Sequence, residues 1–175
     1  MATLEERVRR LEDRAELQDL VAAYFRAVDD DDYGAVGDSF TEDAEFVASG
    51  FDGDRTRDAV VAFLQAARAG MGQTVHTPNY VQIEFLSDCE ATGLVGAHLE
   101  LGLGEQTYFG AVRYIDLYRR AEGRWRIARR EMKAIHMAPW SQVETSLTSA
   151  LNVRWPGAEP LPSDCPRKGQ AVPGA

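Results

Sequence analysis

The chain has 175 residues, which is the size of one ordinary domain. Hydrophobic residues make up 45% of the sequence and charged residues 27%, as in a folded globular protein. With 28 acidic residues against 19 Lys and Arg, the net charge is −9. This balance argues against nucleic acid as a partner, because phosphate binding needs a basic surface.

The sequence carries no pattern for export or membrane insertion. Glu5, Glu6 and Arg7 stand where a secretory signal needs apolar residues, and no later stretch approaches about 18 consecutive apolar residues. Cys89 and Cys165 form no CxxC motif, so neither a disulfide framework nor a structural zinc site is predicted. We therefore expect a cytoplasmic protein without a membrane partner.

The first part of the chain is predicted to be mainly helical. Apolar residues at intervals of three and four predict an amphipathic helix from Leu4 to about Val28, with a break near Ala15 left open. A second helical pattern begins at Thr56 and stops at Gly70. Between these helices lie a run of four aspartates at 29–32, a short helical piece at 33–40, a strand at 44–48 and a turn at 49–54.

The second part alternates apolar and polar residues with a period of two, which is typical of strands. Four long strands are predicted, at 75–86, 91–101, 107–118 and 124–135. Their short separators are typical of successive antiparallel hairpins. Beyond Pro139, repeated prolines predict an extended tail with at most one short helix, at 143–151.

This element order predicts an α+β domain with helices on one face of a curved antiparallel sheet. Apolar residues occur at both parities of the strand at 107–118, as Tyr114 and Ile115 illustrate. Both sheet faces are therefore expected to be covered, one by the helices and the other by a second subunit. We expect a homo-oligomer, with dimer and trimer both open.

Asp29 is the first candidate for chemistry. It lies four residues after Phe25 and eight after Val21, on the apolar stripe of the first helix, so its carboxylate is expected to point inward. The helix C-terminus and the neighbouring aspartates are both expected to raise its pKa. Two alternatives stay open: a fully solvated turn at 29–32, or Asp32 as the inward residue.

Two histidines could serve as partners. His76 begins the first long strand beside Pro78, which removes one amide donor from the ladder and predicts an irregular strand entry. An imidazole there can act as a general base if an aspartate fixes its tautomer, whereas the alternative is a purely structural histidine. His98, central in its strand, belongs either to a pocket or to the core.

The sequence lacks the motifs of several other chemistries. No two histidines are spaced at i, i+2 or i, i+4 and HExxH is absent, so no metal site is predicted. The segment Gly102-Leu103-Gly104 lacks the third glycine of a dinucleotide fingerprint and reads as a hairpin turn.

Several short stretches together resemble the SnoaL-like branch of the NTF2-like superfamily. They are Arg14–Leu20, Tyr24, Val28-Asp29, Phe40–Phe46, His76 with Asn79 ahead of Ile83–Phe85, and Gly123–Ile127. The resemblance covers about residues 4 to 137. It implies a cone in which N-terminal helices pack on a strongly curved mixed or antiparallel sheet and enclose a pocket. We expect this domain at 1–137 and a Pro-rich extension, of open role, at 138–175.

The resemblance also implies residue roles. Lyases of this branch need no cofactor and pair a helix-end aspartate with a strand histidine, positions that Asp29 and His76 match. Tyr24 or His98 would then protonate the leaving group, and Arg130, or alternatively Arg129, would face it. Further residues expected to bind substrate or line the pocket are Phe25, Phe46, Asn79, Tyr80, Tyr108 and Tyr114.

The function implied is a cofactor-independent dehydratase. Its substrate would be a hydrophobic small molecule, polycyclic or aromatic and hydroxylated, such as a steroid, polyketide or terpenoid. The alternatives are a cyclase or isomerase that uses the same pocket in natural-product biosynthesis, and a non-catalytic subunit that binds a small molecule.

Overall fold

The structure, a computed structural model, describes residues 2–48 and 55–168. The turn predicted at 49–54 lies outside these residues. The helices are α1 (Leu4–Asp29), α2 (Tyr33–Asp38), α3 (Arg57–Arg68) and α4 (Val143–Ser146), with a 3₁₀ turn at Trp140–Gln142. The strands are β1 (Phe40–Val47), β2 (Met71–Phe85), β3 (Glu90–Leu103), β4 (Gln106–Ala121) and β5 (Arg124–Pro139).

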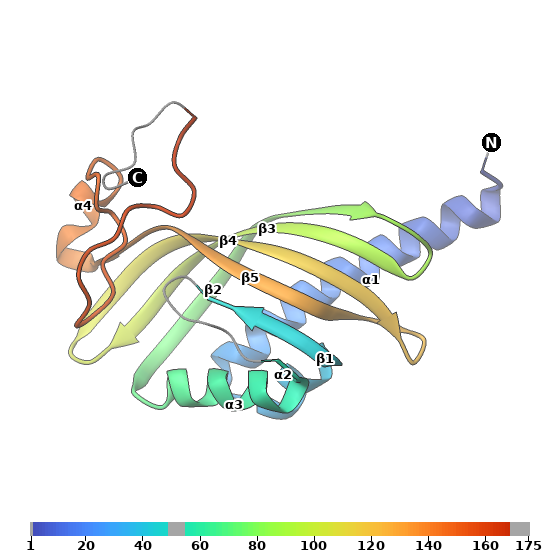
Figure 1. Ribbon diagram of the computed structural model, residues 1–175, viewed down its shortest axis with the longest axis horizontal. Coiled ribbons are helices and arrows are strands. Elements are labelled where there is room, and N and C mark those ends of the chain that lie inside the picture. The colour runs from blue at the N-terminus through green and yellow to red at the C-terminus, as the bar shows by residue number, and fades with distance from the viewer. Residues whose placement is uncertain (1, 49–54, 169–175) are drawn as a thin grey trace.

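The predicted α+β class is confirmed. The five strands form one strongly curved, open sheet in the order β1-β5-β4-β3-β2, and α1, α2 and α3 pack on its concave side (Figure 1). β2 to β5 form the predicted antiparallel meander, whereas β1 pairs with β5 in parallel. The sheet is therefore mixed.

α1 is one uninterrupted helix, without a break at Ala15. A capping box between Thr3 and Glu6 satisfies its first amide groups. In its C-terminal half, the buried residues Leu17, Val21 and Phe25 press against the sheet, and this packing holds the last residue, Asp29, against β2.

Several boundaries differ from the predicted ones. The helical piece expected at 33–40 ends at Asp38, and β1 begins at Phe40 instead of 44, because Phe40 pairs in parallel with Ile127. β2 begins at Met71 instead of 75, because its first residues pair with the end of β3. Both pairings join residues distant in sequence, which local periodicity does not record.

A bulge in β2 decides which side chains face the helices. Pro78 pairs with Ala97 and Tyr80 with Gly96, so Asn79 is the extra residue. Because successive strand residues face opposite sides, this insertion reverses the parity of everything after it. His76 consequently faces the concave side, whereas Tyr80 faces the convex side.

The C-terminal tail folds back onto β5. Val153 forms isolated bridges with Met137 and with Leu161, and the Asp164 carboxylate accepts a hydrogen bond of 2.8 Å from the amide of Ala134. The tail lies at the opposite end of the sheet from the projecting N-terminal turns of α1 (Figure 1). The short helix α4 is confined to 143–146, within the range predicted for it.

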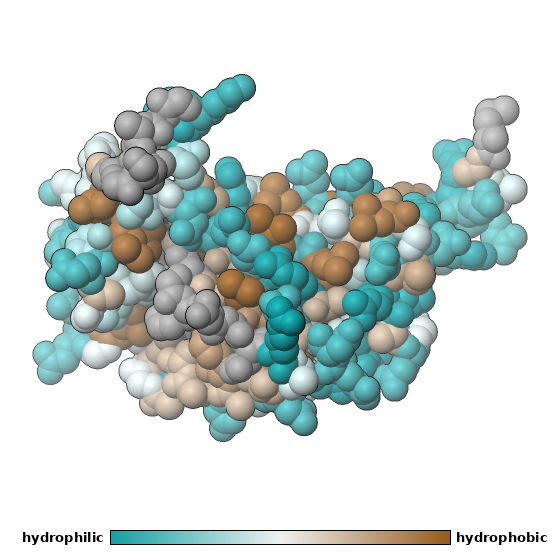
Figure 2. All heavy atoms as spheres, in the orientation of Figure 1, coloured by the Kyte–Doolittle hydropathy of each residue, from teal (hydrophilic) through white to brown (hydrophobic). Residues whose placement is uncertain are grey.

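On the face shown in Figure 2, hydrophilic side chains predominate and hydrophobic ones form separate small patches. None of the helices in the described residues is both long and apolar enough to cross a bilayer.

Candidate active site

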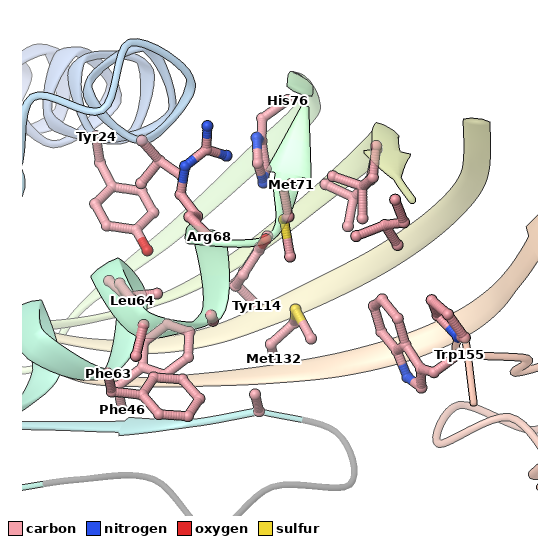
Figure 3. A pocket seen from close by; sticks show the side chains of 18 residues that line it. Tyr24, Phe46, Phe63, Leu64, Arg68, Met71, His76, Tyr114, Met132 and Trp155 are labelled. Carbon is pink, nitrogen blue, oxygen red and sulfur yellow. The ribbon is translucent and has the colours of Figure 1, made fainter. Parts of the chain in front are cut away.

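The concave side of the sheet and the helices enclose a cavity of about 490 Å³. Its walls are almost entirely apolar and come from α1, β1, α3, β2 to β5 and the tail. Figure 3 shows His76 and Arg68 on one side of it, the rings of Phe46 and Phe63 below, and Trp155 of the tail at the far end. The volume suits a small organic molecule.

Asp29 and His76 meet at the wall of this cavity. Oδ1 of Asp29 lies 2.6 Å from Nδ1 of the His76 ring, and Oδ2 accepts a 2.8 Å hydrogen bond from the His76 backbone amide. The Asp29 carboxylate therefore contacts both the ring and the main-chain amide of His76. The Phe25 ring stacks on the imidazole with centroids 5.5 Å apart, which restricts its rotation.

Asp29 remains a carboxylate at neutral pH. Burial, the largest single influence, raises its pKa, but hydrogen bonds from the His76 ring, Thr74 and the His76 amide together bring the pKa below its usual value. The prediction that this pKa is raised was therefore wrong, because the donors around the carboxylate outweigh burial. An ionised Asp29 requires a proton on His76 Nδ1, which in the neutral imidazole leaves the lone pair on Nε2.

A second set of hydrogen bonds supports Asp29 from behind. The Thr74 hydroxyl donates to Asp29 Oδ1 over 2.7 Å, and Arg68 Nη1 donates to Thr74 Oγ1 over 2.7 Å. Nε of Arg68 in turn donates to the carboxylate of Asp31. Arg68 lines the cavity and is 8% exposed.

Next to these groups, an arginine is buried among aromatic rings. Arg130 is fully buried and donates two hydrogen bonds, of 2.8 and 2.7 Å, to Asp116 on the neighbouring strand. Its guanidinium carbon lies 4.4 Å from the ring centroid of Tyr24 and 4.8 Å from that of Tyr114. Burial raises the pKa of both tyrosines, so both keep their hydroxyl protons at neutral pH.

A SnoaL-like domain family model matches residues 9–131. The protein belongs to the SnoaL-like family. The resemblance stated from the sequence is thereby confirmed, and with it the NTF2-like fold. A search of curated proteins found no match.

Solved structures resemble this SnoaL-like protein in fold. A candidate scytalone dehydratase from Novosphingobium aromaticivorans is 19% identical, with a TM-score of 0.70 over 75% of this chain and 90% of its own. Hexachlorocyclohexane dehydrochlorinase LinA-type3 from Novosphingobium barchaimii is 21% identical, with a TM-score of 0.73 over 78% and 95%. A candidate aromatic ring hydroxylase from Novosphingobium aromaticivorans is 27% identical, with a TM-score of 0.69 over 74% and 94%. These names describe different reactions on one fold.

Four of the predicted site residues line the cavity of this SnoaL-like protein: Tyr24, Phe46, His76 and Tyr114. Asp29 does not line the cavity itself but contacts the ring of His76, which does. Phe25, Tyr108 and Arg130 are buried beside the cavity without lining it. The inward orientation of Arg130, opposite Asp116, separates it from Arg129, which faces the other side and binds Glu45 and Glu131.

Three predicted site residues lie outside the cavity. His98 faces the convex side, where its ring stacks on Phe109 with centroids 5.6 Å apart. Asn79, the bulge residue, contacts that histidine at 3.2 Å. Tyr80 is 43% exposed and accepts a hydrogen bond from Arg113. The parity of β3 places His98 outward, and the bulge in β2 turns Tyr80 away from the cavity.

Other site residues of the SnoaL-like protein were not foreseen. Thr74 lies on the same strand face as His76, and Asp116 lies on the same face as Tyr114, which precedes it by two residues. Strand parity alone could therefore have indicated both. Arg68 ends α3 and lies in its last turn. Trp155 reaches the cavity only because the tail folds back, which no local pattern predicts.

The described residues contain no group of three or more His, Cys, Asp or Glu arranged to hold a metal ion. The polar groups at the cavity include an imidazole, two phenols and a guanidinium. Such a set can move protons at a bound molecule.

Proposed function

We propose that this protein is a cofactor-independent dehydratase, with His76 as general base oriented by Asp29. The observation that carries the proposal is the imidazole of His76 at the wall of an apolar cavity, held at 2.6 Å by a carboxylate that keeps Nδ1 protonated. This arrangement gives Nε2 a free lone pair in a site with few other polar groups.

The proposed reaction is an elimination. Nε2 of His76 takes a proton from a carbon made acidic by an adjacent carbonyl or aromatic ring. The electron pair of that C–H bond forms a carbon–carbon double bond as the neighbouring C–O bond breaks. The departing hydroxyl takes a proton from Tyr24 and leaves as water, and the imidazolium then returns a proton to the phenolate through solvent.

Tyr24 suits the role of acid. Burial raises its pKa, so it holds its proton until a stronger base forms beside it. The guanidinium over its ring lowers the pKa again in part and would stabilise the phenolate that forms. His98, the other residue expected to supply this proton, lies on the wrong face of the sheet.

The walls support a hydrophobic, hydroxylated substrate of polycyclic or aromatic type. Aromatic and aliphatic side chains such as Phe46, Phe63 and Leu101 leave few polar contacts for a sugar or nucleotide. The volume of about 490 Å³ accommodates a molecule of a few fused rings.

The test is a screen of hydroxylated polycyclic and aromatic ketones, with products identified by mass spectrometry. We expect loss of water by the wild-type protein and at least about a 100-fold lower turnover in His76→Ala. His98→Ala, which removes an imidazole from the convex face, is the matched control and should keep wild-type turnover. Equal activity of His76→Ala and wild type would exclude this mechanism.

The same screen separates the alternatives. A product with the mass of the substrate would identify an isomerase or cyclase that uses the same base. Tight binding of a hydroxylated ketone without any product would identify a binding subunit.

A further inference from the structure

Behind the Asp29 and His76 side chains runs a chain of hydrogen bonds that reaches the protein surface. It starts at the imidazole, passes through Asp29, Thr74 and Arg68, and ends at Asp31. Thr74 is 6% exposed and Arg68 8%, so both central members are shielded from water. In a shielded site, the direction in which each hydrogen bond is donated has a large energetic effect.

The direction of the Thr74 hydroxyl is forced by its two neighbours. A guanidinium has only donors, so the oxygen of Thr74 must accept from Arg68. The single proton of the hydroxyl is then free to point only at Asp29 Oδ1, 2.7 Å away. Arg68 itself is held in place by the carboxylate of Asp31, which also accepts from Tyr33.

We propose that Thr74, oriented by Arg68, is a positioning residue that holds Asp29 as the carboxylate partner of His76. Oδ1 of Asp29 receives two donors, the hydroxyl of Thr74 and Nδ1 of His76, and both favour the ionised form. In the neutral imidazole the proton therefore stays on Nδ1, and Nε2 carries the lone pair. The catalytic part of this role rests on the proposed function, while the tautomer of His76 can be measured without a substrate.

Other charged and titratable groups face this site and remain constant in the comparison below. The carboxylates of Asp31 and Asp29 repel each other, and Tyr114 on β4 lies close enough to Asp29 for that carboxylate to raise the pKa of the tyrosine. Tyr24 on α1 lines the same cavity. A change confined to Thr74 leaves all of them in place.

The first measurement is the ¹⁵N NMR spectrum of the His76 ring at neutral pH. In the wild-type protein we expect a protonated Nδ1 and an unprotonated Nε2. Thr74→Val keeps the shape of the side chain but removes its hydroxyl, so we expect the signals to move toward a mixture of tautomers. Thr74→Ser keeps the hydroxyl and should restore the wild-type spectrum. Thr77→Val, on the exposed face of the same strand, is the matched control and should change nothing.

The second measurement is the pH profile of kcat/KM on any substrate found by the screen. Without the Thr74 donor, Asp29 holds its negative charge less well and the dyad binds a proton more tightly. We expect the acidic limb of the profile to move to higher pH in Thr74→Val and to stay in place in Thr74→Ser and Thr77→Val. A loss of stability alone would lower activity at every pH without moving the limb.

Unchanged His76 signals in a folded Thr74→Val protein would overturn the proposal. If that variant does not fold, as judged by circular dichroism, Thr74→Ala gives the same test, because it also removes the hydroxyl that donates to Asp29 Oδ1. Unchanged signals in a folded Thr74→Ala protein would then overturn the proposal. These outcomes are independent of the proposed dehydratase, which is tested separately by the turnover of His76→Ala and by the mass of the product.

Discussion

Two features of its surroundings have opposite effects on the pKa of Asp29. Burial favours its neutral form, and three hydrogen-bond contacts from Thr74 and His76 favour its charged form and prevail. A position on an apolar helix stripe could be predicted from the sequence, and it correctly placed the residue inward. The hydrogen-bond donors around Asp29 could not be predicted in this way, because they lie on β2 and helix periodicity carries no information about that strand.

The lowered pKa of Asp29 predicts how stability depends on pH. Its folded-state pKa lies below the ordinary 3.8, so its contribution is complete above that pH and is lost as the pH falls through the folded-state value. We expect Asp29→Asn to unfold at lower urea than wild type at pH 7, with the gap narrowing below pH 3.8. Asp19→Asn, at an exposed site on the same helix, is the control. A gap between Asp29→Asn and wild type that stays constant with pH would contradict this account.

At the scale of elements, strand register decides the composition of the site. Of the residues expected at the site, Tyr114 on β4 and His76 on β2 both line the cavity. Tyr80 does not line it, since the extra residue Asn79 reverses the faces of β2 after Pro78, and the position of this bulge is set by pairing with β3. The irregular entry predicted from Pro78 was the one local sign of this reversal.

The pairing of β4 with β5 makes a second prediction. Asp116 and Arg130 are both fully enclosed and bonded to each other, so removal of one leaves an uncompensated buried charge. We expect Asp116→Asn or Arg130→Met to lower the free energy of unfolding by about 3–5 kcal/mol in urea titrations. Replacing both residues together with apolar ones should cost less than the sum of the single changes. Additive losses would show that the two side chains act independently.

At the scale of the whole molecule, two features lie outside the helices and the concave sheet face: the C-terminal tail and the convex face of the sheet. Composition predicted a separate Pro-rich tail but not that Trp155 and Pro156 would line the cavity. The homo-oligomer expected from the apolar residues on the outer sheet face stays a prediction. Apolar side chains of that face are partly exposed: Val75 at 49%, Tyr80 at 43% and Ile115 at 40%.

Sedimentation velocity tests that prediction. We expect a mass above that of one chain for the wild-type protein and dissociation in Ile115→Asp, because a charge in a packed interface lacks a partner. Leu4→Asp, at an exposed site on the first turn of α1, is the control and should leave the assembly intact. A wild-type monomer at high protein concentration would disprove the expectation.

The central claim is that His76 removes a proton from carbon inside the cavity. It is tested by single-turnover rates on a substrate deuterated at the carbon next to its carbonyl, compared with the undeuterated substrate. The account predicts a slower rate with deuterium in the wild-type protein, and in His76→Ala a rate at least about 100-fold lower for both substrates. Equal single-turnover rates with the two substrates in the wild-type protein, together with an undiminished rate in His76→Ala, would contradict it.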